Sequence, residues 1–346
     1  MTRVVVVDDS PFMRTQIADI LEGEGLDVVA QAKNGRDAVD AVAETEPDVV
    51  TMDIKMPGIG GLEAVRRIMA DTPTPILMLS GYVEEGSNFL FESLDAGAVD
   101  FFPKPGGEVS PELVRYRDLL TDTVRAVADA DVAPTTPTEP TTPSDSASTP
   151  TDVAVPEQPT LVIGASTGGP SVVEDLVADL PLDHQFRILV VLHMPPKFTG
   201  RYANRLDDAS EYAFTEAESG TVVGAGEGVV ARGDRHLEVT RESPSGLTLS
   251  LTDDPPRHSV RPAIDVTMET AAATVSGPLV GVILTGMGHD GAAGIEAIKA
   301  ADGRTIAQYP ESCAVDGMPA TAIDTGCVDE VLPVNRIPSA LVELLS

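Results

Sequence analysis

Short apolar segments alternate with amphipathic ones over residues 1–128 of this chain. Apolar runs of roughly four to eight residues are typical of buried strands, and apolar residues at helical spacing are typical of covering helices. Strands that alternate with helices pair in parallel, so the pattern predicts a five-stranded, doubly wound α/β sheet with its site at the carboxyl strand ends. The expected strands are residues 4–7, 26–30, 49–52, 76–79 and 99–102, with helices after Ser10 and at 35–44, 62–69, 88–96 and 111–128.

Polar residues follow four of these strands. Asp8 and Asp9 follow the first, Asp53 the third, Ser80 the fourth and Lys104 the fifth. Carboxylates gathered at one sheet edge would bind a hard divalent cation, most naturally Mg²⁺. A lysine and a hydroxyl beside them suit an incoming phosphoryl group, with Asp53 as the nucleophile. The alternative is a set of solvated loop acids, which is the weaker interpretation because four separate strand ends contribute.

Residues 1–125, within an expected domain of residues 1–128, resemble the receiver domain of two-component response regulators, which has a flavodoxin-like fold. The matching residues are Asp8-Asp9, Asp53, Met56-Pro57, Ser80, Phe101 and Lys104-Pro105. The resemblance implies phosphorylation of Asp53 by a histidine kinase. It implies a Mg²⁺ site formed by Asp8, Asp9, Asp53 and the carbonyl of Lys55, and a switch formed by Ser80, Phe101 and Lys104. Gly60 replaces a usual acidic or amide residue, and Phe101 replaces the commoner tyrosine, so no ring hydroxyl takes part.

Residues 129–158 are rich in Thr, Pro, Ser, Asp and Glu and carry only isolated apolar residues. Such a segment cannot bury enough apolar surface to offset the entropy of ordering, so we expect a flexible linker. A glycosylated, mucin-like stalk is the alternative, which the lack of a secretory signal disfavours. Residues 159–346 are then a second domain.

The net charge of −32 limits the partners of the chain. Nucleic acid is excluded, because no basic patch is visible to neutralise phosphates. An acidic surface repels itself at low salt, which indicates a protein that works in concentrated salt. The sequence shows no apolar stretch of about 18 residues and no signal peptide, so we expect a cytoplasmic protein without membrane insertion. Cys313 and Cys327 are expected to be small buried residues.

Gly164-Ala165-Ser166-Thr167-Gly168 follows an apolar run and precedes a segment of helical spacing. It fits G-x-S-x-G, a strand–turn–helix pattern that exposes a nucleophilic serine. Free amide groups at the helix N-terminus would stabilise an oxyanion there. The alternative is a glycine-rich turn that binds phosphate or merely connects two elements.

The rest of the second domain continues the strand–helix alternation. Residues 221–251 differ, because they alternate polar and apolar residues about a turn and predict an antiparallel hairpin insertion. We therefore expect a Rossmann-like, doubly wound, mostly parallel sheet with that insertion. The other expected strands are residues 186–192, 279–285, 305–308 and 328–332, and the other helices lie at 201–208, 263–275, 292–301, 319–325 and 337–345.

Three strand ends of this domain carry Ser166, His193 and Asp290. Neighbouring parallel strands would bring them to one edge, where histidine takes the serine proton and aspartate orients the histidine. His193 is favoured as the base because it ends a buried strand. Among the other histidines, His184 is expected to be solvated, His236 starts a hairpin strand, His258 is a candidate for lining the cleft, and His289 adjoins Asp290.

Two other classes of function compete with a hydrolase. Gly286, Gly288 and Gly291 fit G-x-G-x-x-G of a dinucleotide site, with Glu311 as the acidic residue on the next strand, but this leaves Ser166 and His193 unexplained. The second domain of a response regulator could also only bind a partner.

Residues 159–346 resemble the catalytic domain of the chemotaxis receptor methylesterases, the CheB type. The matching segments are Ile163-Gly-Ala-Ser-Thr-Gly-Gly-Pro170, His193-Met-Pro, Arg261-Pro-Ala-Ile-Asp265-Val, Leu284-Thr-Gly-Met-Gly-His-Asp-Gly291 and Gly317-Met-Pro319. The resemblance implies hydrolysis of glutamyl methyl esters on chemoreceptors, and deamidation of receptor glutamines, by Ser166, His193 and Asp290 without a cofactor at that site. Thr167 would help hold the histidine, the Met287 amide would serve the oxyanion, and His289 stands where asparagine is frequent. The unphosphorylated receiver would cover the cleft and phosphorylation would release it.

Overall fold

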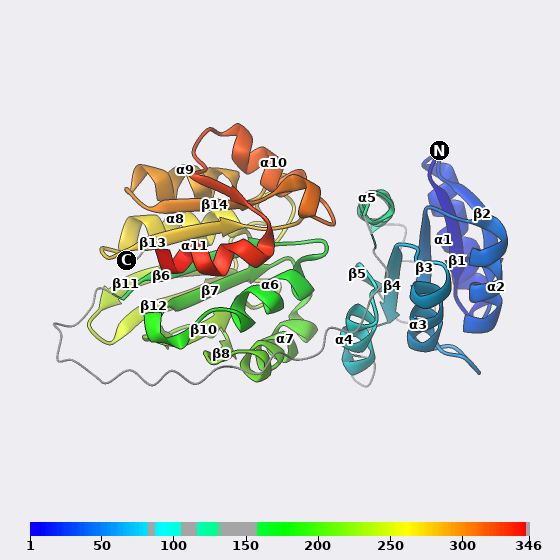
Figure 1. Ribbon diagram of the computed structural model, residues 1–346, viewed down its shortest axis with the longest axis horizontal. Coiled ribbons are helices and arrows are strands. Elements are labelled where there is room, and N and C mark those ends of the chain that lie inside the picture. The colour runs from blue at the N-terminus through cyan, green and yellow to red at the C-terminus, as the bar shows by residue number, and fades with distance from the viewer. Residues whose placement is uncertain (82–86, 105–115, 131, 133–157, 344–346) are drawn as a thin grey trace.

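The structure of the chain is a computed structural model that describes residues 1–81, 87–104, 116–130, 132 and 158–343 (Figure 1). These residues form two α/β units. The predicted flexible linker at 129–158 lies almost wholly outside the described residues, as do Pro105 and residues 111–115 of the predicted fifth helix.

The first unit is a five-stranded parallel sheet in the order β2-β1-β3-β4-β5. This flavodoxin-like order brings the carboxyl ends of β1, β3, β4 and β5 side by side. Helix α1 begins as predicted: Pro11 is its first residue, and the Ser10 hydroxyl accepts the Met13 N–H at 3.4 Å. The elements are β1 (Arg3–Val7), α1 (Pro11–Gly23), β2 (Asp27–Ala32), α2 (Gly35–Thr45), β3 (Val49–Asp53), α3 (Gly61–Asp71), β4 (Ile76–Gly81), α4 (Ser87–Asp95), β5 (Asp100–Lys104) and α5 (Arg117–Ala128).

The second unit is a seven-stranded sheet in the order β15-β14-β13-β6-β7-β10-β8, in which every pair is parallel. Its elements are β6 (Thr160–Ala165), α6 (Gly169–Ala178), β7 (Arg187–Leu192), α7 (Pro196–Ala209), β8 (Ala213–Glu216), β10 (Glu227–Val230), α8 (Ile264–Thr274), β13 (Leu279–Ile283), α9 (Ala292–Ala300), β14 (Arg304–Gln308), α10 (Gly317–Asp324), β15 (Glu330–Leu332) and α11 (Ile337–Glu343), with short 3₁₀ turns at Leu182–His184, Pro310–Ser312 and Val334–Arg336. A separate antiparallel sheet contains β9 (Val222–Val223), β11 (His236–Ser243) and β12 (Gly246–Thr252).

The predicted antiparallel insertion at 221–251 is only partly correct. β10 lies inside this range but pairs in parallel with β7 and β8, so it extends the main sheet. Val229 and Val230 of β10 are both buried, as in strands that are covered on both faces. The polar–apolar alternation of the neighbouring hairpin hides this short buried run in the sequence. β8 was not predicted, because this short edge strand alternates exposed and buried residues over only four positions.

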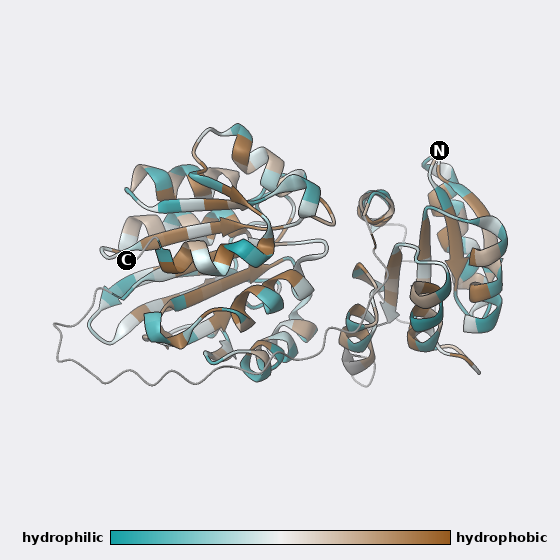
Figure 2. Ribbon diagram, viewed as in Figure 1, coloured by the Kyte–Doolittle hydropathy of each residue, from teal (hydrophilic) through white to brown (hydrophobic). Residues whose placement is uncertain are grey.

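Strands of both sheets are apolar and covered by helices (Figure 2). One apolar cluster continues from the first unit into the second. Phe91 of α4 stacks on Tyr202 of α7 with ring centroids 6.0 Å apart, and Phe101 of β5 lies 5.3 Å from Phe198 of α7. The first unit therefore docks on the second through α4 and β5. None of the described helices is long and apolar enough to cross a membrane.

Candidate active site and receiver site

Three side chains converge at the carboxyl edge of the second sheet. Ser166 follows β6, the central strand, while His193 follows β7 on one side and Asp290 lies in the loop after β13 on the other. His193 Nδ1 is 3.1 Å from Ser166 Oγ, and His193 Nε2 is 2.8 Å from Asp290 Oδ2. A hydroxyl, an imidazole and a carboxylate are thus hydrogen-bonded in series, as a serine hydrolase requires. In serine proteases Nε2 faces the serine and Nδ1 faces the aspartate, whereas here Nδ1 faces Ser166 and Nε2 faces Asp290. Either ring nitrogen can accept or donate a proton, so the arrangement supports the same chemistry.

The strand order explains why the residues meet there. After β6 the chain adds β7, then β8 at the edge and β10 between β7 and β8, all on one side. It later adds β13, β14 and β15 on the other side. Open α/β sheets bind ligands where the strand order reverses, because the connections leave in opposite directions and open a crevice. The boundary between β6 and β13 is this point.

Two glycines let the backbone close around Ser166. Gly168 has φ +74°, which side-chain-bearing residues rarely adopt, and a Cβ there would lie 2.7 Å from the Ala314 Cβ. A Cβ on Gly286 would lie 2.9 Å from the Ser166 Cβ. The loop that carries Met287 therefore passes directly against the serine.

Asp290 is buried and held by three donors. Its Oδ2 accepts hydrogen bonds from His193 Nε2 at 2.8 Å and from the Ile264 N–H at 2.7 Å. Its Oδ1 accepts the Asp265 N–H at 3.0 Å. Burial alone would raise the pKa of Asp290, but the His193 hydrogen bond and charge and the two backbone N–H groups together hold this pKa below its usual value. The carboxylate is therefore ionised at neutral pH and hydrogen-bonded to the His193 ring.

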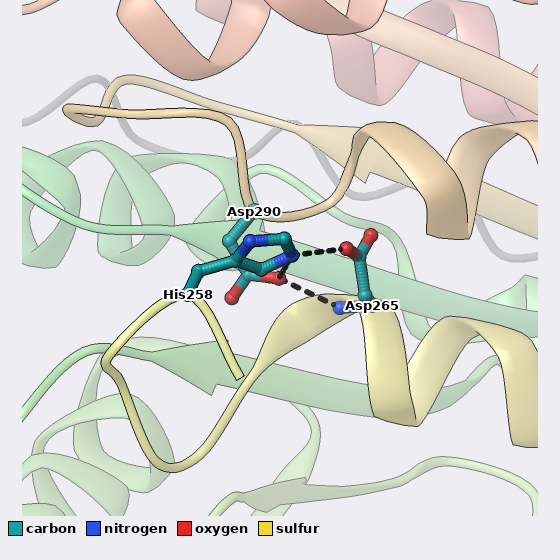
Figure 3. A group of neighbouring side chains, drawn as sticks. All are labelled: His258, Asp265 and Asp290. Atoms are coloured by element: carbon teal, nitrogen blue, oxygen red, sulfur yellow. Dashed lines mark hydrogen bonds and ion pairs between the residues drawn. The ribbon is translucent and has the colours of Figure 1, made fainter. Parts of the chain in front are cut away.

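The other histidines are placed differently from His193. His236 is buried and hydrogen-bonded to Pro255 O and to the Ala263 N–H, which is a structural role. His258 lies next to the site but contacts Asp265, as Figure 3 shows, and its ring meets the edge of His289 with centroids 4.4 Å apart.

The dinucleotide alternative fails at the start of α9. In such a site the helix N–H groups bind the pyrophosphate. Here the Asp265 carboxylate already accepts the Gly291 and Gly294 N–H groups, at 3.0 and 2.7 Å. The first and last glycines of this loop serve close packing instead: Gly286 packs against Ser166, and Gly291 against Ile283 and Ile264.

Comparisons with known proteins identify the family of the chain. The sequence matches the CheB methylesterase family over residues 161–341 and the response regulator receiver domain over residues 4–112. The chain belongs to the CheB methylesterase family. The membership confirms the resemblance predicted from the sequence, and it contradicts the alternative of a second domain that only binds a partner.

Relatives of this CheB chain span its whole length. A protein-glutamate methylesterase/protein-glutamine glutaminase of Haloarcula marismortui is 50% identical, with 99% of this chain and 98% of the relative covered. The protein of the same description from Natronomonas pharaonis is 53% identical, with 99% and 97% covered. The crystal structure of the Thermotoga maritima CheB methylesterase catalytic domain superposes with a TM-score of 0.52 at 41% identity, covering 54% of this chain and 98% of that one.

The receiver unit of this CheB family member gathers its predicted residues at one edge. Lys104 Nζ lies 2.5 Å from Asp8 Oδ2 and 2.7 Å from Asp53 Oδ1. Asp8, Asp9 and Asp53 each offer an oxygen within 4.8 Å of the others. Burial raises the pKa of Asp53 to about 6, against the lowering effect of Lys104, and the charges of Asp8 and Asp9 add to the rise. A cluster of hard oxygen donors that repel one another fits the divalent metal site that receiver domains have.

Asp100 of the receiver unit reaches the turn after β6, which carries Ser166, in the second unit. Its carboxyl group is buried there and accepts hydrogen bonds from the Thr167 side chain and the Gly168 N–H. Thr167 was expected to hold His193, but within the described residues its side chain is engaged with Asp100 instead. The turn that bears Ser166 is therefore covered by the receiver.

Three residues of this CheB site were missed from the sequence. Asp265 lies inside a matching segment, but its position on a helix gave no sign that it faces Asp290. Asp100 and Phe198 matter only because the two units dock, and an apolar residue on one helix face does not reveal which partner covers it.

Proposed function

We propose that this protein hydrolyses γ-glutamyl methyl esters of chemoreceptors and deamidates receptor glutamines, under control of its receiver domain. The observation that carries the proposal is the series Ser166 Oγ, His193 and Asp290, joined at 3.1 and 2.8 Å at the switch point of the sheet. The relatives' description, protein-glutamate methylesterase/protein-glutamine glutaminase, names the same acyl chemistry. The expected location is the cytoplasm, where receptor tails lie.

The reaction follows from the roles of the three residues. His193 Nδ1 takes the Ser166 proton as Oγ attacks the ester carbonyl carbon, and Asp290 stabilises the imidazolium. The bond to the methoxy oxygen breaks, and methanol leaves with that proton. Water then adds to the acyl-enzyme, again with His193 as base, and releases the glutamate side chain and free Ser166. A glutamine amide reacts in the same way and releases ammonia.

The oxyanion of the intermediate needs donors next to Ser166. The Met287 N–H is our candidate, because Gly286 brings its loop against the serine and this N–H has no acceptor within the described part of the chain. An N–H aimed at the developing charge stabilises the transition state more than the ground state.

Phosphorylation of Asp53 is proposed as the control. Asp8, Asp9, Asp53 and the Lys55 carbonyl would hold Mg²⁺, which neutralises charge on the incoming phosphoryl group. A histidine kinase would be the donor. Ser80 and Lys104 are buried at the same edge, and Phe101 packs on Phe198 of the catalytic unit. A change at Asp53 can thus reach the contact between the units through Phe101.

The docked receiver is proposed as the inhibited state. Asp100 occupies the Gly168 N–H and the Thr167 side chain, next to the nucleophile. Arg205 of α7 adds an ion pair with Asp95 of α4, and it lies 5.6 Å from the Phe91 ring centroid. Phosphorylation can release the cleft only by its differential stabilisation of the undocked state.

Methanol release from a receptor carrying labelled methyl esters tests the proposal. We expect release by the whole chain in concentrated KCl, and faster release when a small phosphodonor and Mg²⁺ are added. A chain that binds receptor but releases no methanol under either condition would contradict the esterase.

The isolated segment 158–346 is expected to be about 5- to 150-fold more active than the unphosphorylated whole chain, since docking free energies of about 1–3 kcal/mol correspond to such factors. The measurement is the rate of methanol release at equal concentrations. Asp53→Asn in the whole chain is the matched control, because it should keep the low rate even with the phosphodonor. Equal rates for segment and unphosphorylated chain would defeat the proposal of cover and release.

Inhibition by the receiver is also expected to weaken as the pH rises. Burial raises the pKa of Asp100 to about 7 in the docked state, against the lowering effect of its hydrogen bonds with Phe101, Gly168 and Thr167. Protonation therefore favours docking: this contribution is fully present below about pH 4 and is lost as the pH rises to about 7. The ratio of segment activity to whole-chain activity should fall at least about threefold between pH 5 and 8. Asp100→Asn should leave that ratio flat, and a flat ratio in the unmodified chain would contradict the prediction.

A further inference from the structure

A second imidazole–carboxylate pair lies behind the triad and has no part in the reaction described above. His258 Nε2 is 2.8 Å from Asp265 Oδ2 and 4.0 Å from Asp290 Oδ1, and Figure 3 shows the ring directed at both carboxylates. Asp265 is 1% exposed and Asp290 2%. Two buried carboxylates are thus adjacent, with His193 on one side and His258 on the other.

Each carboxylate accepts hydrogen bonds from the N-terminus of the helix next to the other carboxylate: Asp290 from α8, and Asp265 from α9. Asp290 precedes α9 and accepts the Ile264 and Asp265 N–H groups at the start of α8. Asp265 lies in the first turn of α8 and accepts the Gly291 and Gly294 N–H groups at the start of α9. Helix N-termini are favourable positions for negative groups, so each carboxylate lies where the helix opposite supplies N–H donors and a favourable dipole. Neither can turn without breaking hydrogen bonds to the helix opposite.

The backbone of the His258 loop is strained. His258 has φ +53° and Ser259 φ +64°, so two consecutive residues with side chains lie in the left-handed region. Such conformations cost free energy and persist where the surroundings impose them, often at functional sites. Here the strained turn presents the His258 ring to Asp265 Oδ2, the oxygen that the α9 N–H groups leave available.

The charges near Asp290 act on His193. Several titratable groups surround the Asp290 and Asp265 carboxylates, either in direct contact with them or one contact away. Besides the two carboxylates themselves they are His193, His258, Arg257, Glu269 and His289. Arg257 lies 3.4 Å from Asp265 but is paired with Glu269 by two hydrogen bonds, at 2.7 and 2.8 Å. The Asp265 carboxylate places a second acidic group next to Asp290, the partner of His193, and the His258 ring, when protonated, places a positive charge there.

We propose that Asp265 and His258 are positioning residues of the esterase, which fix the Asp290 carboxylate and set the pH range in which His193 acts as a base. The inference rests on the triad proposed above and deepens it. Asp265 acts through the reciprocal hydrogen bonds between the N-termini of α8 and α9 and the two carboxylates. His258 acts through its hydrogen bond to Asp265 and through the positive charge of its protonated ring. Neither residue touches the substrate in this role.

The test follows activation of Ser166 without the receptor. A fluorophosphonate probe is attacked by the Ser166 oxygen and loses fluoride, so its labelling rate against pH reports when His193 is an effective base. The test uses the whole chain with phosphodonor and Mg²⁺. His258→Gln keeps a hydrogen-bond donor but removes the ring that carries a positive charge when protonated. The acid side, or acid limb, of its rate–pH profile is therefore expected to move up by about half to one pH unit. Asp265→Asn removes a negative charge, so its limb should move down. The matched control His184→Gln, on a distant 3₁₀ turn, should leave the limb in place.

Shifts of the two rate–pH profiles in opposite directions would support the proposal. A purely structural defect would lower the labelling rate without moving the acid sides of the two profiles apart. An unmoved limb in His258→Gln, or shifts of both variants in one direction, would overturn it. If the buried Asp265→Asn variant does not fold, His258→Gln decides alone, because its side chain is 24% exposed on a loop. Failure of the proposed function gives a different result: the unmodified chain itself would neither be labelled at Ser166 nor release methanol.

Discussion

Ser166→Ala is expected to lower methanol release from labelled receptor by at least about 10⁴-fold. In the proposed reaction the Ser166 oxygen bonds to the acyl carbon, and without it His193 has no nucleophile within 3.1 Å from which to take a proton. The remaining rate would come from water attack assisted by the oxyanion donors, which do not depend on the serine side chain. The loss should appear in kcat, because the missing interaction is made in the transition state.

The fold should survive this substitution. The Ser166 backbone bonds, its N–H to Thr285 O at 3.0 Å and its carbonyl to the Gly169 N–H at 2.7 Å, do not use the side chain. The free energy of unfolding should therefore change by less than about 1 kcal/mol. Ser245→Ala, on the exposed turn of the β11–β12 hairpin, is the matched control and should keep full activity. A Ser166→Ala protein that still releases methanol at the normal rate would show that another group is the nucleophile.

Strand and helix positions could be predicted well because local patterns determine them. Val4, Val5, Val6 and Val7 form an uninterrupted apolar run, and all four are fully buried in β1. Ser10 and Pro11 mark the start of α1 by capping chemistry that needs no tertiary contact. The prediction failed where pairing partners decide, as at β10, whose four residues do not specify whether they join the main sheet or the hairpin.

Residues at strand ends were the predictable part of the site. Parallel pairing brings the carboxyl ends of β6 and β7 to one edge, so Ser166 and His193, which directly follow these strands, are neighbours there. Asp290 lies in the loop between β13 and α9, and the first N–H groups of α8 hold it at the same edge. Contacts between distant helices were not predictable in this way. Asp265 contacts Asp290 because the N-termini of α8 and α9 lie side by side. Asp100 contacts Thr167 because the two units dock. Neither fact leaves a periodic signal in the sequence.

Asp290→Asn is expected to reduce kcat by about 10³- to 10⁴-fold while the receptor still binds. Three donors converge on the carboxylate: the His193 ring, the Ile264 N–H and the Asp265 N–H. Asparagine has one acceptor oxygen, so its amide group must face one of them. If it faces His193, the ring proton moves to Nδ1, the atom next to Ser166, and the histidine can no longer accept the serine proton.

The substitution should also destabilise the fold, which separates it from Ser166→Ala. Whichever way the amide turns, one buried N–H loses its acceptor, at a cost of about 1–3 kcal/mol in the free energy of unfolding. Denaturant unfolding and methanol release, measured on the same preparation, check both parts. Asp302→Asn is the matched control, because this exposed residue follows α9 with φ +59°, a conformation that asparagine tolerates, so both quantities should stay unchanged. An Asp290→Asn protein with normal kcat would mean that His193 needs no carboxylate to act as the base.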